Sequence, residues 1–524
     1  MVKYVYCLNR MLKRLSVTTI VCHIAFNYCF SSENYNLLIQ DTLDLTKISF
    51  AISDSSLLTS ILSVPSDTFS STSYTRLKGI TTFRGGPYRD RASIGRISKR
   101  PDSLVIKWSA KTAPQGEWGG GAGWTGQPSV VQWPNELRTK MNIDPKFSDS
   151  LFVEVIAASL DGNVYFLDLE TGTPSRKPIK INNPIKGSVS IDPRGFPILY
   201  VGQGIANKKI FGFRIFSLID QQLLYFLDGN DPFSIRNWAA FDGSPLINAA
   251  NDVMYLGGEN GLLYCVKLNT RYDSLTGKAN IAPQELRLRY KVNDDHKVGI
   301  ENSVAAYGNK IFFADNHGYI LAIDLSTLKP LWVIHNYDDT DASLIIQPEA
   351  GIPYLYTGSE VDKQGKMGFS YLKKINGLTG ATVWEKKYPC LTVLGDHPVN
   401  GGMLATPIIG KMNSSGKIIF NLARYKELNK GLLVALNQTT GEVLYEVSLP
   451  NYSWSSPVDI YDEEGNMFIF LADSKGYVML LDGENGTMIY KKKIAELFEA
   501  SPVVFDNKII IPSRPNKIFC LEIR

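Results

Sequence analysis

Several patterns that mark common enzyme classes are missing from this 524-residue chain. No two of its five histidines have the spacing of metal ligands, and neither HExxH nor a paired Cys/His zinc motif occurs. No two cysteines are adjacent, and there is no CxxCH haem-attachment motif. The GxSxG pattern of serine hydrolases and the Walker A loop are also absent. No catalytic residue can therefore be named from a motif, and we expect a non-catalytic protein.

The chain also lacks a strong charge of either sign. It has 55 Lys and Arg against 51 Asp and Glu, which gives no basic footprint for nucleic acid. Three of the six cysteines fall in the first 30 residues, and the other three are far apart in the sequence. We therefore expect no disulfide framework, and at most a single disulfide bridge. Hydrophobic residues make up 44%, enough for a large buried core.

The N-terminus has the order of an export signal. Residues 1–14 carry four basic residues and no acidic one, and residues 15–30 are mostly apolar. We therefore predict that residues 1–30 are a signal peptide or membrane anchor, and that the protein is exported: periplasmic, membrane-anchored or extracellular. Lipidation at Cys22 or Cys29 is an alternative, although neither preceding residue is small. Membrane association is expected only through this segment. Residues 31–80, rich in Ser and Thr, are predicted to be a lead-in.

One pattern then recurs every 40 to 63 residues: a small residue, a Ser or Thr, often Pro, then β-branched residues. Its second position falls at Gln127, Ser188, Ser244, Ser303, Ser343, Thr406, Ser456 and Ser501. Most units continue with three more apolar runs separated by Gly-containing turns, which indicates four strands per unit. This repeat predicts an all-β fold, an eight-bladed β-propeller of four-stranded antiparallel blades.

The last unit is one strand short. It begins at ASPVV (500–504) and ends with KIFCLEIR (517–524). An unassigned strand with an aromatic residue, SLVIKWSAK (103–111), precedes the first unit. We predict that this N-terminal strand completes the last blade and closes the ring, which leaves no open edge.

The repeated turns also carry a family resemblance. LAIDLSTLKPLW (321–332), KKINGLTGATVW (373–384), LVALNQTTGEVLY (433–445) and the lead-in FRGGPYRD (83–90) resemble the PQQ-like β-propeller repeat family. The resemblance covers about residues 80–524, and we assign residues 81–524 to the propeller. It implies the fold but no single function, because the family includes quinoprotein alcohol dehydrogenases and outer-membrane assembly lipoproteins.

The enzyme members of that family set a further expectation. They hold a quinone between a Trp and a ring made by adjacent Cys residues, beside a calcium bound by Glu and Asn, and use a catalytic Asp. This chain lacks the Cys pair and the long blade insertions. We therefore expect no cofactor. PQQ with calcium, in a quinone-dependent dehydrogenase, remains an alternative, as does a polysaccharide-acting enzyme that uses acidic residues of the central funnel.

The residues two positions before the repeated Ser are expected to surround one mouth of the channel. Four of these eight positions are acidic: Asp242, Glu301, Asp341 and Glu499. A ring of carboxylates could hold a cation such as Ca²⁺, which prefers oxygen ligands. The alternative is that they are solvated loop residues, or that they pair with Lys186, Arg236 or Lys297.

Aromatic residues are expected at the same face. They are Trp118, Trp124, Trp238 and Trp454. Exposed there, they would suit a flat ligand, a sugar ring or a peptide; the alternative is that they pack between blades. We expect a protein or glycan partner, and interpret the chain as a binding or assembly scaffold of the cell envelope or extracellular space.

Overall fold

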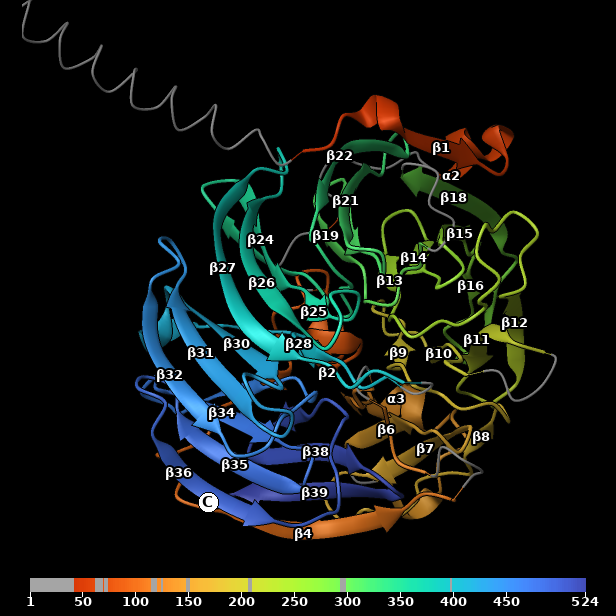
Figure 1. Cartoon of the computed structure of the whole chain (residues 1–524). Helices are drawn as coiled ribbons and strands as arrows, with labels where there is room; N and C mark the ends of the chain where they lie inside the picture. The colour runs from red at the N-terminus through yellow and green to blue at the C-terminus, as the bar shows by residue number, and fades with distance from the viewer. Residues whose placement is uncertain are drawn as a thin grey trace, which may run out of the picture.

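Eight sheets surround a central axis in the computed structural model, which describes residues 42–61, 69, 74–114, 120–123, 126–147, 151–205, 210–292, 298–395 and 398–524. Each of these sheets has at least four strands. Figure 1 shows the sheets arranged as blades around the axis. The predicted eight-bladed all-β propeller is confirmed. Pairing within the repeated strands of every blade is antiparallel, from the innermost strand outward.

The first four blades follow one another along the chain. The first contains β5 (Ser129–Gln132), β6 (Glu154–Ala158), β7 (Asn163–Asp168) and β8 (Ile179–Lys180). The second contains β9 (Ser190–Ile191), β10 (Ile198–Val201), β11 (Gly212–Ser217) and β12 (Leu223–Asp228). The third contains β13 (Leu246–Asn248), β14 (Val253–Gly257), β15 (Leu262–Lys267) and β18 (Gln284–Val292). The fourth contains β19 (Ala305–Tyr307), β20 (Lys310–Ala314), β21 (Tyr319–Asp324) and β22 (Lys329–His335).

The remaining blades continue this order. The fifth contains β23 (Ile345–Glu349), β24 (Ile352–Gly358), β26 (Met367–Asn376) and β27 (Thr382–Leu391). The sixth contains β29 (Ile408–Ile409), β30 (Lys417–Ala423), β31 (Gly431–Asn437) and β32 (Val443–Leu449), with β25 (Glu360–Val361) and β28 (Gly401–Gly402) added. The seventh contains β33 (Val458–Tyr461), β34 (Met467–Ala472), β35 (Tyr477–Asp482) and β36 (Met488–Lys493).

The eighth blade joins the two ends of the propeller sequence. Its strands are β37 (Val503–Phe505), β38 (Lys508–Ser513), β39 (Lys517–Ile523), and, from before the first blade, β4 (Leu104–Lys111) and β3 (Ser93–Ile94). Strand β4 pairs antiparallel with β39, with Trp108 opposite Cys520. Figure 1 shows β4 lying along the outer edge of this blade. The predicted ring closure is confirmed.

The aromatic residue of the repeat fastens the outer strands of blades four, five and eight to the next blade. Three indole N–H groups donate to carbonyl oxygens in a neighbouring blade: Trp108 to Leu169 at 2.8 Å, Trp332 to Gly377 at 3.0 Å, and Trp384 to Gln438 at 3.0 Å. The indole ring lies against the glycine of the same turn, which has a positive φ: Gly172, Gly380 and Gly441 respectively. The Gly of each T-G turn therefore contacts the Trp of the preceding blade. The repeated T-G and Trp residues thus form a contact between blades as well as shaping the turn.

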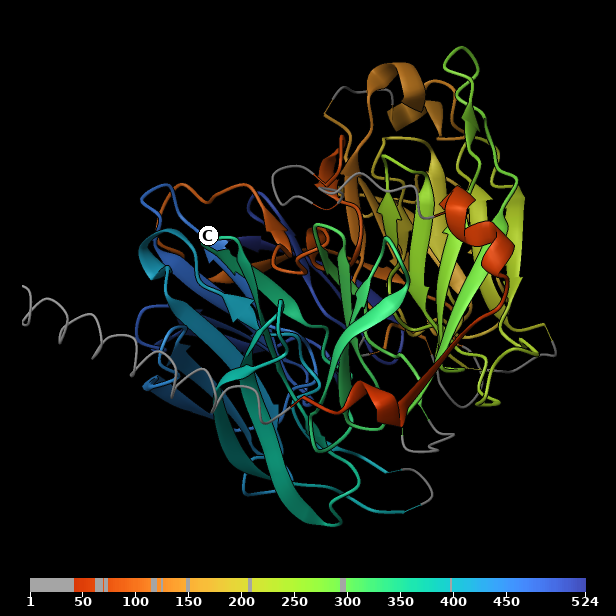
Figure 2. The same ribbon diagram turned by 90° about the horizontal axis from the view of Figure 1, so that it is seen from above.

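Part of the N-terminal region packs on the outside of the ring. Strand β1 (Ile48–Ile52) pairs antiparallel with β18, and the N–H of Leu43 donates to Val333 O at 2.8 Å, so the segment crosses blades three and four (Figures 1 and 2). Three short turns flank it: η1 (Leu45–Lys47), η2 (Ser55–Leu57) and α2 (Leu58–Ile61). Strand β2 (Lys78–Ile80) extends blade one by pairing with β5.

No helix among the described residues has both the length and the apolar character needed to cross a membrane.

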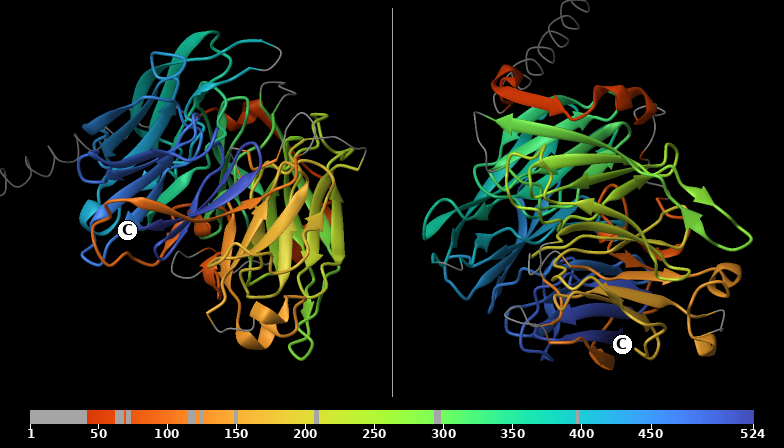
Figure 3. Two further views of the ribbon diagram at one scale, coloured as in Figure 1. Left: turned by 90° about the horizontal axis from the view of Figure 1, so that it is seen from below. Right: turned by 90° about the vertical axis from the view of Figure 1, so that its right-hand side faces the viewer.

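Two insertions project from blades one and three. One holds α3 (Asn135–Arg138) and η4 (Pro145–Phe147), between β5 and β6, and the other is the hairpin of β16 (Arg271–Tyr272) and β17 (Ala279–Asn280). They lie side by side in both views of Figure 3, and Lys140 Nζ donates to Ser274 O at 2.6 Å. A further short turn, η5 (Met412–Ser414), precedes β30.

The FRGGPYRD segment fills the centre of the ring. It contains η3 (Phe83–Gly85) and two fully buried arginines. Arg84 donates to the carbonyls of Pro407 and Pro457 at 2.7 and 3.0 Å, whereas Arg89 donates to those of Val304 and Ser244 at 2.9 and 3.0 Å. Burial lowers the pKa of Arg84 to about 10 and that of Arg89 to about 9, so both stay charged at neutral pH. The segment thus joins blades on opposite sides of the axis.

Candidate functional site

The repeated Ser or Thr forms a ring of hydrogen bonds around the axis. In six neighbouring pairs of blades, the backbone N–H of this residue donates to the side-chain hydroxyl of its counterpart in the next blade. The pairs are Gln127 to Ser188 (2.8 Å), Ser244 to Ser303 (2.8 Å), Ser303 to Ser343 (3.0 Å), Ser343 to Thr406 (3.1 Å), Thr406 to Ser456 (3.0 Å) and Ser456 to Ser501 (3.3 Å). The hydroxyl is therefore needed to order the mouth of the channel, and it holds the preceding residues in equivalent places.

Three of the four acidic residues predicted for the mouth meet there. Asp242, Glu301 and Asp341 line one cavity of about 10 Å³, together with Phe83 of the central segment. A cavity of this volume holds about one water molecule or one ion. Glu499 is not among the lining residues. It pairs with Arg514, from the turn between β38 and β39, at 2.9 Å, so the predicted acidic ring is restricted to blades three to five.

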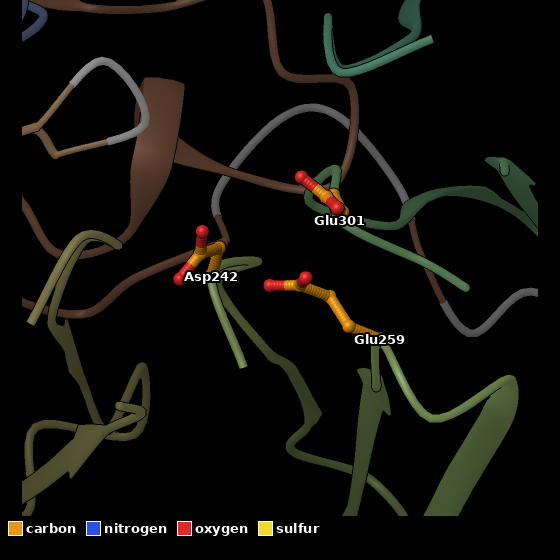
Figure 4. Close-up of side chains that lie close together, drawn as sticks. All are labelled: Asp242, Glu259 and Glu301. Atoms are coloured by element: carbon orange, nitrogen blue, oxygen red, sulfur yellow. The ribbon is translucent and has the colours of Figure 1, made fainter. Parts of the chain in front are cut away.

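Three more carboxyl groups enlarge this site. Asp242, Glu259 and Glu301 have side-chain oxygens within 4.8 Å of one another, and in Figure 4 their carboxyl groups face one another. A second group, Asp339, Asp341 and Glu360, meets the same limit. We call these six residues the carboxyl cluster. Glu259, Asp339 and Glu360 were not predicted. Glu259 and Glu360 directly follow similar sequences at the end of a second strand, YLGG (255–258) and LYTGS (355–359).

One lysine approaches the cluster closely. Lys186, from the equivalent position of blade two, lies 2.6 Å from Asp242 Oδ2. This pairing was one of the alternatives raised for the acidic residues, and it accounts for a single negative charge. Although burial opposes it, the positive charge of Lys186 lowers the pKa of Glu301, and the neighbouring carboxylates, chiefly that of Asp242, raise the pKa of Lys186. Lys186 therefore stays protonated.

Burial dominates the other carboxyl groups. It raises the pKa of Asp242, Glu259 and Glu360, and it raises that of Asp341 to about 8 with help from the charge of Glu301. Burial and the adjacent Asp341 raise the pKa of Asp339 in the same way. Like charges this close in a buried place disfavour ionisation. The cluster must therefore take up protons or a cation.

The side-chain oxygen of Asn316 favours a cation, in preference to protons, at the carboxyl cluster. Asn316 holds in blade four the place that Glu259 and Glu360 hold in blades three and five, and it is only 8% exposed. The Asn316 amide and the backbone oxygen of Glu259 both lie next to Gly299. A Cβ added to Gly299 would be 3.2 Å from Asn316 Nδ2 and 2.6 Å from that oxygen. Asn316 Oδ1 is buried and accepts no hydrogen bond from the residues that the structure describes. A buried oxygen without a donor is costly unless a ligand contacts it.

The two described tryptophans of the predicted face are attached to this cluster. Trp238 is 43% exposed, and its Nε1 donates to Glu259 Oε2 at 2.6 Å. Trp454 is half-buried and donates to Asn400 O at 3.2 Å, while Asn400 Nδ2 donates to Glu360 Oε2 at 3.0 Å. Trp118 and Trp124 lie outside the described residues.

The donor set fits a cation and does not fit a quinone. Carboxylate and amide oxygens are the ligands that Ca²⁺ prefers, usually six to eight of them. A three-ring quinone needs a far larger space, since pockets for molecules of drug size measure roughly 300–1,000 Å³. The cavity among the described mouth residues is about 10 Å³. Between these two expected ligands, the cation is the one that the described mouth residues could hold.

Comparison with known proteins gives the fold and no closer relationship. No family model matches the sequence, and no curated protein matches it. Among solved structures, a quinohemoprotein alcohol dehydrogenase of Pseudomonas putida HK5 has a TM-score of 0.56 and 12% identity over 88% of this chain and 83% of that one. The quinohemoprotein alcohol dehydrogenase of Comamonas testosteroni has a TM-score of 0.52 and 11% identity over 89% and 83%. BamB of Moraxella catarrhalis has a TM-score of 0.48 and 15% identity over 80% and 100%.

These likenesses confirm structural similarity to PQQ-type propellers. At 11–12% identity they show the shared fold alone, which hosts more than one function.

Proposed function

We propose that the protein is an exported, non-catalytic binding scaffold whose channel mouth holds an oxygen-preferring divalent cation of the Ca²⁺ class. The observation that carries this proposal is the meeting of six carboxyl groups in two groups of three, from the loops of blades three to five and from β25 at the edge of blade six. The buried oxygen of Asn316, which accepts no hydrogen bond from the described residues, is the second observation. Buried carboxylates are costly unless they are compensated. A bound cation would compensate several of them at once.

The cation would give the scaffold a fixed binding face. It would hold the loops of blades three, four and five in one arrangement and leave any coordination sites facing the mouth open to a partner. We place that partner, a protein or a glycan, on the face that carries Trp238 and Trp454. The apolar segment at residues 15–30 supports an exported location, with the propeller held in the cell envelope or released outside the cell.

Terbium luminescence tests the cation site directly. Tb³⁺ replaces Ca²⁺ at oxygen sites and emits when a nearby indole is excited, and the indole of Trp238 already touches the ligand Glu259. We expect Tb³⁺ emission under tryptophan excitation, its displacement by Ca²⁺, and at least tenfold weaker binding in Glu301→Gln. Glu463→Gln, at an exposed site in blade seven, is the matched control and should bind as the parent does.

Two results would overturn the proposal. Absence of saturable Tb³⁺ emission, or equal Tb³⁺ affinity in Glu301→Gln and Glu463→Gln, would remove the cation site. Reduction of an electron-accepting dye with alcohols or sugars, after reconstitution with PQQ and Ca²⁺, would replace the scaffold with a dehydrogenase.

A further inference from the structure

The two mouth tryptophans mark opposite ends of the carboxyl cluster. Trp238, in the loop that precedes blade three, is fixed to Glu259 by its indole N–H. Trp454, in the loop that precedes blade seven, reaches Glu360 through Asn400. A ligand that touches both aromatic residues would therefore reach from one group of three carboxyl groups to the other.

The exposed ring of Trp238 is suited to stacking. The hydrogen bond to Glu259 fixes its orientation, while 43% of its surface stays exposed, so little conformational entropy remains to be lost on binding. Trp454 packs against Tyr452, with ring centroids 5.8 Å apart. Rigid aromatic faces with one polar end bind flat, partly apolar surfaces, such as the C–H face of a sugar ring or an aromatic side chain.

The charge balance discriminates between these ligands. Arg236 donates to the backbone oxygen of Glu259 and lowers the pKa of Glu301 by its charge, and Lys363 acts in the same sense on Asp339. With Lys186, these three cations and one divalent ion would offset five of the six carboxylate charges, while Asp362 adds a further negative charge beside Asp339. A ligand that completes the coordination shell should then be neutral, because a carboxylate or phosphate would restore the excess negative charge.

We propose that the scaffold binds a neutral carbohydrate chain across the channel mouth. Vicinal hydroxyl groups of one sugar would coordinate the cation, and the rings on either side would stack on Trp238 and Trp454. This inference rests on the proposed cation-dependent scaffold. It names the class of ligand as neutral glycan, in preference to an acidic glycan or a peptide.

The experiment uses the full chain and a panel of immobilised neutral oligosaccharides: cellohexaose, mannohexaose, laminarihexaose and maltoheptaose. We expect at least one to bind in Ca²⁺ and to be released by EGTA. Trp238→Ala and Trp454→Ala should each weaken binding at least tenfold, and Trp238→Phe should retain most of it. Leu275→Ala removes a side chain that is 85% exposed on the β16–β17 hairpin, and it should have no effect.

Ca²⁺ binding measured by calorimetry separates the two proposals. If Ca²⁺ binds and no oligosaccharide in the panel does, the carbohydrate inference fails and the cation site stands. It also fails if an oligouronate or a peptide binds in place of the neutral panel. If an oligosaccharide binds equally in EGTA, with no Ca²⁺ site found, both the cation site and its role in carbohydrate binding are refuted.

Discussion

The contact between Trp384 and Gly441 permits a quantitative test of how the blades are fastened. Gly441 has a φ of 71°, and a Cβ added to it would lie 2.9 Å from two ring atoms of Trp384. Gly416 has a similar φ of 88° but nothing within 4 Å of the same position. The two glycines therefore share the backbone requirement and differ in the contact.

Gly416→Ala should reveal the backbone cost alone. An L-residue loses roughly 1–2 kcal/mol in the left-handed region, partly offset by a gain of about 0.4–1 kcal/mol from the stiffer unfolded chain. We expect a net loss of about 1 kcal/mol. Gly441→Ala adds the cost of overpacking, typically about 1–3 kcal/mol, and should lose about 2–4 kcal/mol in the free energy of unfolding.

A double-mutant cycle in urea separates these contributions. Trp384→Ala alone should cost about 3–5 kcal/mol, since it removes a buried ring and its hydrogen bond to Gln438. In the Trp384→Ala background the ring is gone, so Gly441→Ala should cost only about 1 kcal/mol, as at Gly416. Equal destabilisation by Gly441→Ala and Gly416→Ala in the parent, or additive effects in the cycle, would refute this account of the blade contact.

Two further predictions concern titration and thiol chemistry. Burial raises the pKa of Asp341 from its ordinary 3.8 to about 8, and it also raises the pKa of Glu360. The contribution of these two groups to the stability of the cation-free fold should therefore be greatest below about pH 4, and it should be lost as the pH rises towards 8. Thermal unfolding with and without Ca²⁺ checks this: Ca²⁺ should raise the midpoint at pH 8 and hardly at pH 5, and equal shifts would contradict it. Burial raises the pKa of the Cys265, Cys390 and Cys520 thiols, so a disulfide reagent should label none of them until urea unfolds the chain, and fast labelling of the native protein would be the contrary result.

The fold could be predicted from the sequence because every blade repeats the same local signals. The Ser or Thr of the inner strand and the Trp of the outer strand each have one partner in the next blade, so their recurrence reports tertiary structure. Closure was predictable for a related reason. Trp108 is the outer-strand aromatic of a blade whose other strands are absent from the sequence around it. In contrast, the Ser and Thr content of residues 31–80 gave no signal for β1.

The candidate site could be predicted only in part, because its residues occupy two kinds of sequence position. Some precede the repeated Ser of a blade, and others follow its second strand. Counting from the repeated Ser located Asp242, Glu301 and Asp341, which share one place in successive blades. Glu259 and Glu360 follow the second strand, and Asp339 lies four residues before its repeated Ser, so that count could not reach them. Glu499 satisfies the count, but its partner comes from a turn at the far end of its own blade, and local sequence does not show that this turn folds back.

The closure of the eighth blade has a consequence for how the protein is made. Trp108 of β4 faces Cys520 of β39, about 400 residues later in the chain. Contacts between such distant residues form late, and until then the unpaired edges remain exposed. Strand β4 must therefore wait through the synthesis of all seven intervening blades before its partner is made. During that time the open ring depends on the Arg84 and Arg89 contacts across the axis, and it is then that a chaperone would be needed most.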